Sequence, residues 1–184
     1  MVGGAAVTAA VIAVRGLETW KRQLVGNARY DVARRMLRTT YELREAIEKV
    51  RNPFMSSGEL DTAWKVTGLS EAERSSNKVQ AQAYQTRWES VSKVRTEFLT
   101  VLIEAEVLWG RTIRSQADGL LDSAGELFVA LIEYLNPGRY SSDERFRRMH
   151  ETVFGNPDRK DEFSTKITEA IEKIETEMRP HLKV

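Results

Sequence analysis

The chain has 184 residues, of which 41% are hydrophobic and 30% charged, and its formal net charge is +1. This length is enough for one domain with a buried core, and the composition excludes wholesale disorder. The sequence contains no cysteine, which excludes disulfides, thiolate nucleophiles and thiolate metal sites. The near-zero net charge creates no overall field that favours nucleic acid.

The first segment, residues 1–16, is apolar and carries no charge from Val2 to Val14. It lacks the basic residues that precede the apolar run of a secretion signal. A spanning helix normally needs about 20 apolar residues, so this run is short for one. We expect residues 1–16 to form a short apolar helix and a possible membrane anchor, with residues 2–22 in contact with the membrane. The alternative is a helix that docks on the rest of the protein.

Basic and aromatic residues that follow this segment are of the types found at membrane interfaces. The candidate membrane-interface residues are Arg15, Trp20, Lys21 and Arg22. Because basic residues stay on the cytoplasmic side, their position predicts a cytoplasmic protein at the inner face of the cell membrane.

Residues 17–184 are expected to form a single helical domain. Its first strong helix spans about 27–51, with Asn27 as N-cap and Asn52-Pro53 as the stop. Pairs such as Arg38–Glu42 and Arg44–Glu48 have the spacing of ion pairs on one helix. The next stretch, 52–69, is expected to be irregular and to fold back onto the bundle. An exposed docking surface in this region is the alternative, and the candidate partner-binding residues are Arg51, Asn52, Phe54 and Trp64.

A capping-box pattern at Ser70–Glu73 predicts the start of a long second helix that runs to Trp109. Its apolar positions follow a heptad pattern, with Arg95 as the charged exception. The pattern continues to Leu135, and we expect a turn between Gly110 and Gly119, because one helix over both stretches would be about 100 Å long. Two further helices are expected, over Glu144–Phe154 and over Asp158–Met178.

No motif for phosphate or dinucleotide binding occurs, and neither histidine follows a glutamate at the spacing of di-iron bundles. No cofactor, metal site or catalytic residue is therefore predicted. Glu104 and Glu106 lie within an apolar stretch, where pairing with Arg111, Arg114 or a neighbouring helix is expected. A ligand site built on Glu104 is the alternative. A second alternative is weak nucleic-acid binding through Arg29, Arg34, Arg35 and Arg38, although the interleaved acidic residues make nucleic acid an unlikely partner.

Six short motifs occur in order along most of the chain. They are TWKRQL, VRNPF, EVLWG, IEYL, DEFSTKI and IEKIETEMRPHLK. In these motifs the chain resembles an uncharacterised family of small bacterial proteins with one N-terminal membrane segment and a helical cytosolic domain. The resemblance implies a membrane segment and transfers no catalytic residue.

Together these features predict an all-α protein: an antiparallel bundle of about four main helices with a long second helix, preceded by a short apolar N-terminal helix. The expected function is a non-enzymatic, membrane-associated interaction or scaffolding module. A protein partner or self-association is expected, because a long helix with a heptad seam presents a surface for pairing. The alternatives are a soluble ligand-binding or enzymatic bundle that uses Glu104 and nearby arginines, and a weak nucleic-acid-binding module.

Overall fold

The protein is all-helical in the residues that its computed structural model describes, which are 3–136, 143–155 and 161–182. Within them, six α-helices pack against one another and no strand occurs. The helices are α1 (Gly3–Arg51), α2 (Ser57–Thr67), α3 (Asn77–Trp109), α4 (Arg111–Leu135), α5 (Asp143–Phe154) and α6 (Glu162–Met178). The expected all-α fold class is confirmed.

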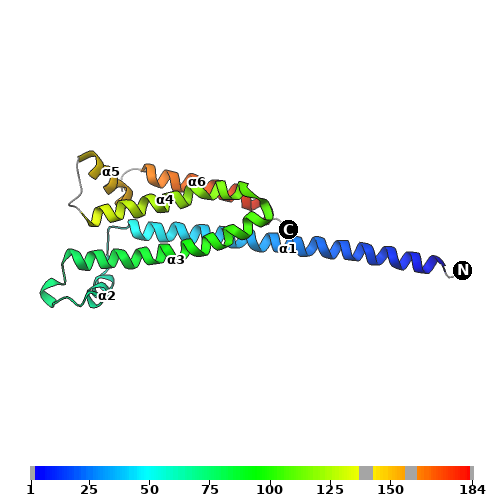
Figure 1. Cartoon of the computed structure of the whole chain (residues 1–184), viewed down its shortest axis with the longest axis horizontal. Helices are drawn as coiled ribbons and strands as arrows, with labels where there is room; N and C mark the ends of the chain where they lie inside the picture. Colours follow the sequence, from blue (N-terminus) through cyan, green and yellow to red (C-terminus); the bar gives the residue numbers. More distant parts are fainter. Residues whose placement is uncertain (1–2, 137–142, 156–160, 183–184) are drawn as a thin grey trace.

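The long helices α1, α3, α4 and α6 run alternately in opposite directions (Figure 1). Side-chain pairs fix their register: Arg35 of α1 meets Glu104 of α3, and Tyr41 of α1 meets Glu175 of α6. Apolar side chains spaced three and four residues apart on each helix fill the space between them. The largest fully buried ones include Tyr84, Phe98, Met36, Leu43, Leu102, Leu127 and Ile174.

The first helix differs from the prediction. We expected a short helix over residues 1–16 and a separate helix from Asn27, but α1 is a single helix from Gly3 to Arg51. The intervening residues include leucine, lysine, arginine and glutamine, which are strong helix formers, and contain no proline. Gly16 and Gly26 each cost only about 1 kcal/mol in a helix. At about 1.5 Å per residue, α1 is roughly 70 Å long.

The stretch 52–69, which we expected to be irregular, contains helix α2. A capping box starts α2: the Glu59 amide donates to the Ser56 hydroxyl at 3.2 Å, and the Ser56 amide donates to the Glu59 carboxylate at 3.1 Å. Gly68 ends α2 with a φ of 64°, a conformation that glycine adopts without strain. The stretch is therefore helical where we expected it to be irregular, although it folds back onto α3, where Ala63 is buried together with Val79 and Ala83.

The second main helix begins later than predicted. The capping box at Ser70 opens only the 3-10 turn η1 (Glu71–Glu73), and α3 begins at Asn77. Ser76 has extended backbone angles (φ −75°, ψ 156°), which separates η1 from α3. Serine favours such positions over helix interiors, because its side chain competes for backbone hydrogen bonds.

The turn between α3 and α4 lies at Gly110, inside the predicted interval. Gly110 has a φ of 77° and a ψ of −168°, which is a conformation essentially restricted to glycine. Gly119, the other candidate for this turn, lies within α4, where a Cβ atom would be 3.4 Å from the Ala170 side chain. Only Gly110 separates α3 from α4, so the regular spacing of apolar residues in the sequence is almost unchanged from one helix to the next.

The last two helices are close to the prediction. Helix α5 covers Asp143–Phe154, and α6 ends at Met178 as expected, followed by the 3-10 turn η3 (Arg179–Leu182). The start of α6 was predicted at Asp158, which lies outside the described residues. Within those residues α6 begins at Glu162, where Asp161 accepts a hydrogen bond from the Ser164 amide at 2.7 Å.

Candidate functional site

Helix α1 continues beyond the other helices. Residues 16–31 of α1, which we call the stalk, are exposed wherever their side chains are described, and Val32 is the first buried residue among the described side chains. Figure 1 shows α1 projecting away from the other helices toward its N-terminus. None of the stalk's described side chains is buried by the helices of its own domain. A helical segment of this kind is available to contact another molecule or a membrane.

Large apolar side chains on the stalk are exposed. Leu17, Trp20 and Leu24 are spaced three and four residues apart, which places them on one face of the helix. Trp20 is 55% exposed and Leu24 is 48% exposed. We call Leu17, Trp20 and Leu24 the apolar stripe. Tryptophan and leucine side chains of a soluble domain are normally in its core, so an apolar stripe on a projecting helix indicates an interaction surface.

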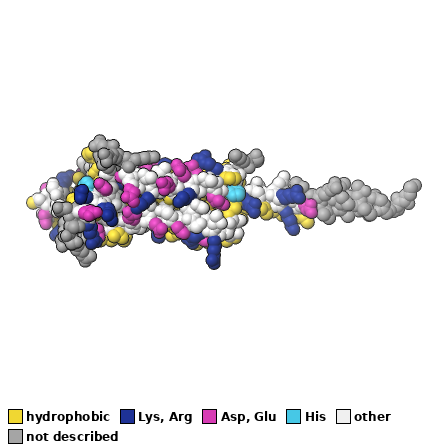
Figure 2. Space-filling model, turned by 90° about the horizontal axis from the view of Figure 1, so that it is seen from above, with side chains coloured by type: hydrophobic (Ala, Val, Ile, Leu, Met, Phe, Trp, Pro, Cys, Tyr) yellow, Lys and Arg dark blue, Asp and Glu magenta, His cyan; other side chains and the backbone are white. Residues whose placement is uncertain are grey.

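Basic side chains accompany the apolar stripe. Lys21 and Arg22, two of the predicted membrane-interface residues, are exposed on the stalk, as is Trp20. Figure 2 shows basic and hydrophobic side chains together on this projecting segment. The backbone of Arg15 is helical, and its side chain lies outside the described part of the chain. None of the helices in the described residues is both long and apolar enough to cross a membrane.

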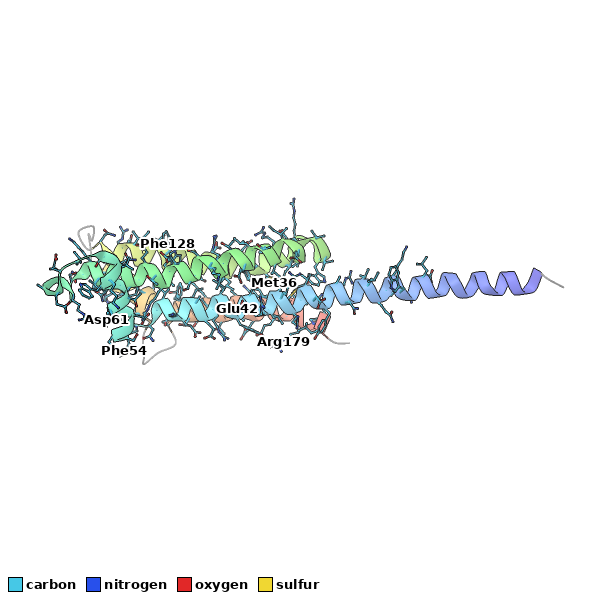
Figure 3. The ribbon with its side chains drawn as sticks, turned by 90° about the horizontal axis from the view of Figure 1, so that it is seen from below. Met36, Glu42, Phe54, Asp61, Phe128 and Arg179 are labelled. Atoms are coloured by element: carbon cyan, nitrogen blue, oxygen red, sulfur yellow. The ribbon has the colours of Figure 1, made fainter. Side chains whose placement is uncertain are left out.

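A second surface lies at the far end of the molecule, where the 52–56 connection and α2 meet the start of α3. A groove of about 610 Å³ runs there, lined by the apolar side chains of Met55, Leu60 and Val79. The Phe54 side chain is 83% exposed at its edge. Phe54 and Asp61, which also lines the groove, both lie at the end opposite the stalk (Figure 3).

Arg87 of α3 holds the backbone of this groove in place. The residue is only 4% exposed, and its guanidinium donates to the Phe54 carbonyl at 2.7 Å and to the Glu59 carboxylate at 2.9 and 3.1 Å. It also donates to the carbonyl of Asn52. Hydrogen bonds from Arg87 lower the pKa of Glu59 to about 2. The connection is therefore rigid, and it presents Phe54 to solvent.

The predicted partner-binding residues do not form one surface. Asn52 and Phe54 are exposed and share the contact with Arg87. Trp64 is half-buried, and its indole N–H donates to the Leu69 carbonyl at 2.9 Å. Arg51 points elsewhere, toward α5 and α6, so only Asn52 and Phe54 remain together, at the contact with Arg87.

Arg51 joins three helices. Its guanidinium donates to the carbonyls of Thr152 and Glu151 at the end of α5, at 2.9 and 3.0 Å. It also forms an ion pair with Asp161 at 3.1 Å, and its side chain is only 10% exposed. A cation near the last carbonyls of a helix stabilises that end. Arg51 is thus an internal contact of the fold.

Glu104 and Glu106 both have arginine partners. Arg35 of α1 forms a two-pronged ion pair with Glu104, and Arg114 of α4 lies 3.1 Å from Glu106. The hydrogen bonds from Arg35 lower the pKa of Glu104 and keep it ionised. Glu104 lines neither the Phe54 groove nor the cleft of about 680 Å³ between α4 and α5. No cluster of acidic and histidine side chains in the described residues has the arrangement of a metal site.

No family model matches this chain, and no significant match was found among curated proteins or among solved structures. Its function therefore has to be inferred from its own geometry, and the family resemblance of the six motifs stays a prediction.

Proposed function

We propose that the protein is a non-enzymatic, membrane-associated interaction module. In this proposal α1, α3, α4 and α6 are the main helices of an antiparallel bundle, and the stalk attaches this bundle to the inner face of the cell membrane. The opposite end of the bundle binds a protein partner. The observation that carries the proposal is the continuity of α1, which extends the bundle into an exposed helix with an apolar stripe.

The chemistry of the stalk supports membrane attachment. The uncharged run Val2–Val14 precedes it, and Trp20 follows within about two turns of that run. Tryptophan is enriched at the level of lipid headgroups, where its ring is in apolar surroundings and its N–H reaches water. A helix with Leu and Trp on one face and basic residues on another is typical of segments that bind the membrane interface.

The distal groove supports partner binding. From Trp20 to Arg51, α1 rises about 45 Å, at about 1.5 Å per residue. The groove beside Phe54 therefore lies at the end of the molecule opposite the proposed membrane-binding stalk (Figure 3). An exposed aromatic side chain on a rigid backbone beside an apolar groove has the character of a binding hot spot.

The two alternatives have less support. A ligand site at Glu104 would need a carboxyl group with a raised pKa in a pocket, whereas the pKa of Glu104 is lowered by Arg35. Nucleic-acid binding would need a continuous row of free arginines on α1, whereas Arg35 pairs with Glu104 and Arg38 lies 3.5 Å from Glu42.

Cell fractionation tests the proposal. The full chain, a chain that begins at Leu17 and the variant Trp20→Ser/Leu24→Ser would be expressed separately, and membranes would be washed with carbonate. The full chain should stay with the membrane, and both altered chains should be released. A matched control, Val66→Ser, replaces an apolar side chain that is 65% exposed on α2 and should not change the distribution. Full-length protein that is entirely soluble would contradict the proposal.

A further inference from the structure

The arginines of α1 divide into two groups along the helix. From Arg35 onward each has a carboxylate within ion-pair distance. The pairs are Arg35–Glu104, Arg38–Glu42, Arg44–Glu45 and Arg51–Asp161. N-terminal to this point, Arg22, Arg29 and Arg34 are exposed and form no ion pair with any described residue. The unpaired arginines therefore lie on the stalk and at the point where it joins the bundle.

A separate element brings another cation to the same level. Because Arg35 pairs with Glu104 and the two helices are antiparallel, moving five residues along each leads from Arg35 to Tyr30 and from Glu104 to Trp109, the last residue of α3. Arg111, which follows the Gly110 turn, is thus near the level of Arg29 on α1. It is exposed and has no ion-pair partner in the described part of the chain.

Few acidic residues oppose these cations. Between residues 15 and 34, α1 contains five basic residues and two acidic ones, Glu18 and Asp31. The rest of the bundle is different, because most of its arginines are neutralised by carboxylates on the same or a neighbouring helix. The excess of positive charge is thus local to the stalk end, although the net charge of the whole chain is only +1.

We propose that this unpaired set, which we call the basic collar (Lys21, Arg22, Arg29, Arg34 and Arg111), binds anionic phospholipid headgroups and makes the membrane attachment selective for anionic bilayers. This inference rests on the proposed function, because the collar acts only where the stalk reaches a membrane. The apolar stripe supplies insertion, which is independent of lipid charge. The collar supplies attraction to negative headgroups, worth about 1 kcal/mol for each basic residue near the surface.

A second copy of the chain is a less suitable occupant of the stalk. Parallel pairing of two stalks along the apolar stripe would bring Arg22 and Arg29 of one copy near those of the other, with only Glu18 and Asp31 to compensate. An anionic surface satisfies the apolar stripe and the cations at once. Charge complementarity therefore favours the membrane.

Vesicle co-sedimentation of the full chain tests the inference. One vesicle preparation contains phosphatidylcholine alone, and the other contains equal parts of phosphatidylcholine and phosphatidylglycerol. Binding to the anionic vesicles should be tighter. The variant Arg22→Gln/Arg29→Gln should weaken binding to anionic vesicles by about thirtyfold, since each residue contributes about 1 kcal/mol and 1.4 kcal/mol is tenfold. Its binding to neutral vesicles should stay unchanged.

The control variant is Lys93→Gln/Arg95→Gln, which removes the same charge from exposed positions of α3 that have no ion-pair partner in the described residues. It should leave binding to both vesicles unchanged. Equal binding of the unmodified protein to both vesicle types would overturn the basic collar and leave the proposed function standing. The same conclusion would follow if the stalk variant and the control variant lost equal amounts of binding to anionic vesicles. Absence of binding to either vesicle, with a dimer that Leu24→Ser dissociates, would overturn both.

Discussion

Replacement of Arg87 by methionine tests whether the backbone beside Phe54 is held by a buried charge. The guanidinium is almost inaccessible to solvent and donates to the Glu59 carboxylate and to two main-chain carbonyls. Methionine fills much of the same volume but donates no hydrogen bond. Arg87→Met therefore leaves a charged carboxylate and two carbonyl groups without their donor.

The size of the effect follows from the pKa of Glu59. Hydrogen bonds from Arg87 lower this pKa from 4.5 to about 2. One pKa unit corresponds to about 1.4 kcal/mol, so the shift corresponds to roughly 3 kcal/mol. The Glu59 side chain is 31% exposed, and solvent weakens the interaction. We expect Arg87→Met to lower the free energy of unfolding by about 2 kcal/mol at neutral pH.

The pH dependence has a definite sign. The pKa of Glu59 is lower in the folded state, so its contribution to stability is complete above the unfolded-state value of 4.5. It is lost as the pH falls from 4.5 toward about 2, because protonation of Glu59 breaks the ion pair. The unmodified protein should therefore lose this contribution on acidification, and Arg87→Met should show a smaller decrease.

Urea unfolding of four proteins provides the assay: the unmodified chain, Arg87→Met, Glu59→Gln and the double variant. The coupling energy between the two positions should be large at neutral pH and small at a pH near the folded-state pKa of Glu59. Arg95→Met, at an exposed position of the same helix, is the control and should be nearly neutral. A coupling energy near zero at neutral pH would refute this description of Arg87.

Three other predictions test the fold, the first with a control substitution. In thermal melts, Gly110→Ala should lower the free energy of unfolding by about 2 kcal/mol, because the backbone conformation at this position is essentially restricted to glycine. Gly125→Ala is the control: Gly125 lies inside α4 with no atom near the added methyl group, so this substitution should raise the free energy of unfolding by about 1 kcal/mol. Equal effects would contradict the assigned turn. Tyr41→Phe removes a hydrogen bond of 2.6 Å to Glu175 and should cost about 1 kcal/mol in urea unfolding; an unchanged stability would mean that this bond does not form. Arg51→Met should speed hydrogen exchange of the α5 amides and leave α3 unchanged, and equal acceleration in both helices would refute a local role.

Local patterns in the sequence were sufficient to predict several features of the fold. The pairs Arg38–Glu42 and Arg44–Glu48 were predicted from their spacing and are found at 3.5 and 3.8 Å. The turn at Gly110 fell inside the predicted interval, since the length of an unbroken helix required a turn there. These features depend on residues close to one another in the chain, where helix geometry fixes the distances.

The missed helix α2 had a readable signal. Ser56 and Glu59 have the spacing of a capping box, and Gly68 has the position of a helix C-cap. We predicted a loop folded onto the core because the stretch is rich in apolar and aromatic residues. In contrast, we predicted a helix start at Asn27, but α1 continues through this residue. Asparagine within a helix costs well under 1 kcal/mol, and the flanking helix formers outweigh this cost.

The role of Arg87 had no signal in the sequence. Its partners are main-chain carbonyls and a carboxylate 28 positions away, so only the packing of α2 on α3 brings them together. The same packing decides that Trp64 is half-buried while Phe54 is exposed, although both were conspicuous aromatic residues. Tertiary contacts of this kind are not encoded in local spacing.

Attachment of the stalk to a membrane can be measured directly by spin labelling. The chain has no cysteine, so Leu17→Cys and Phe54→Cys each provide one labelling site, at the stalk and at the distal groove. With anionic vesicles present, collisions with oxygen and with a water-soluble nickel complex report the depth of each label. Membrane attachment of the stalk predicts that the label at residue 17 becomes protected from the nickel complex and accessible to oxygen, while the label at residue 54 stays in water. A label at residue 17 that remains fully accessible to the nickel complex would contradict it.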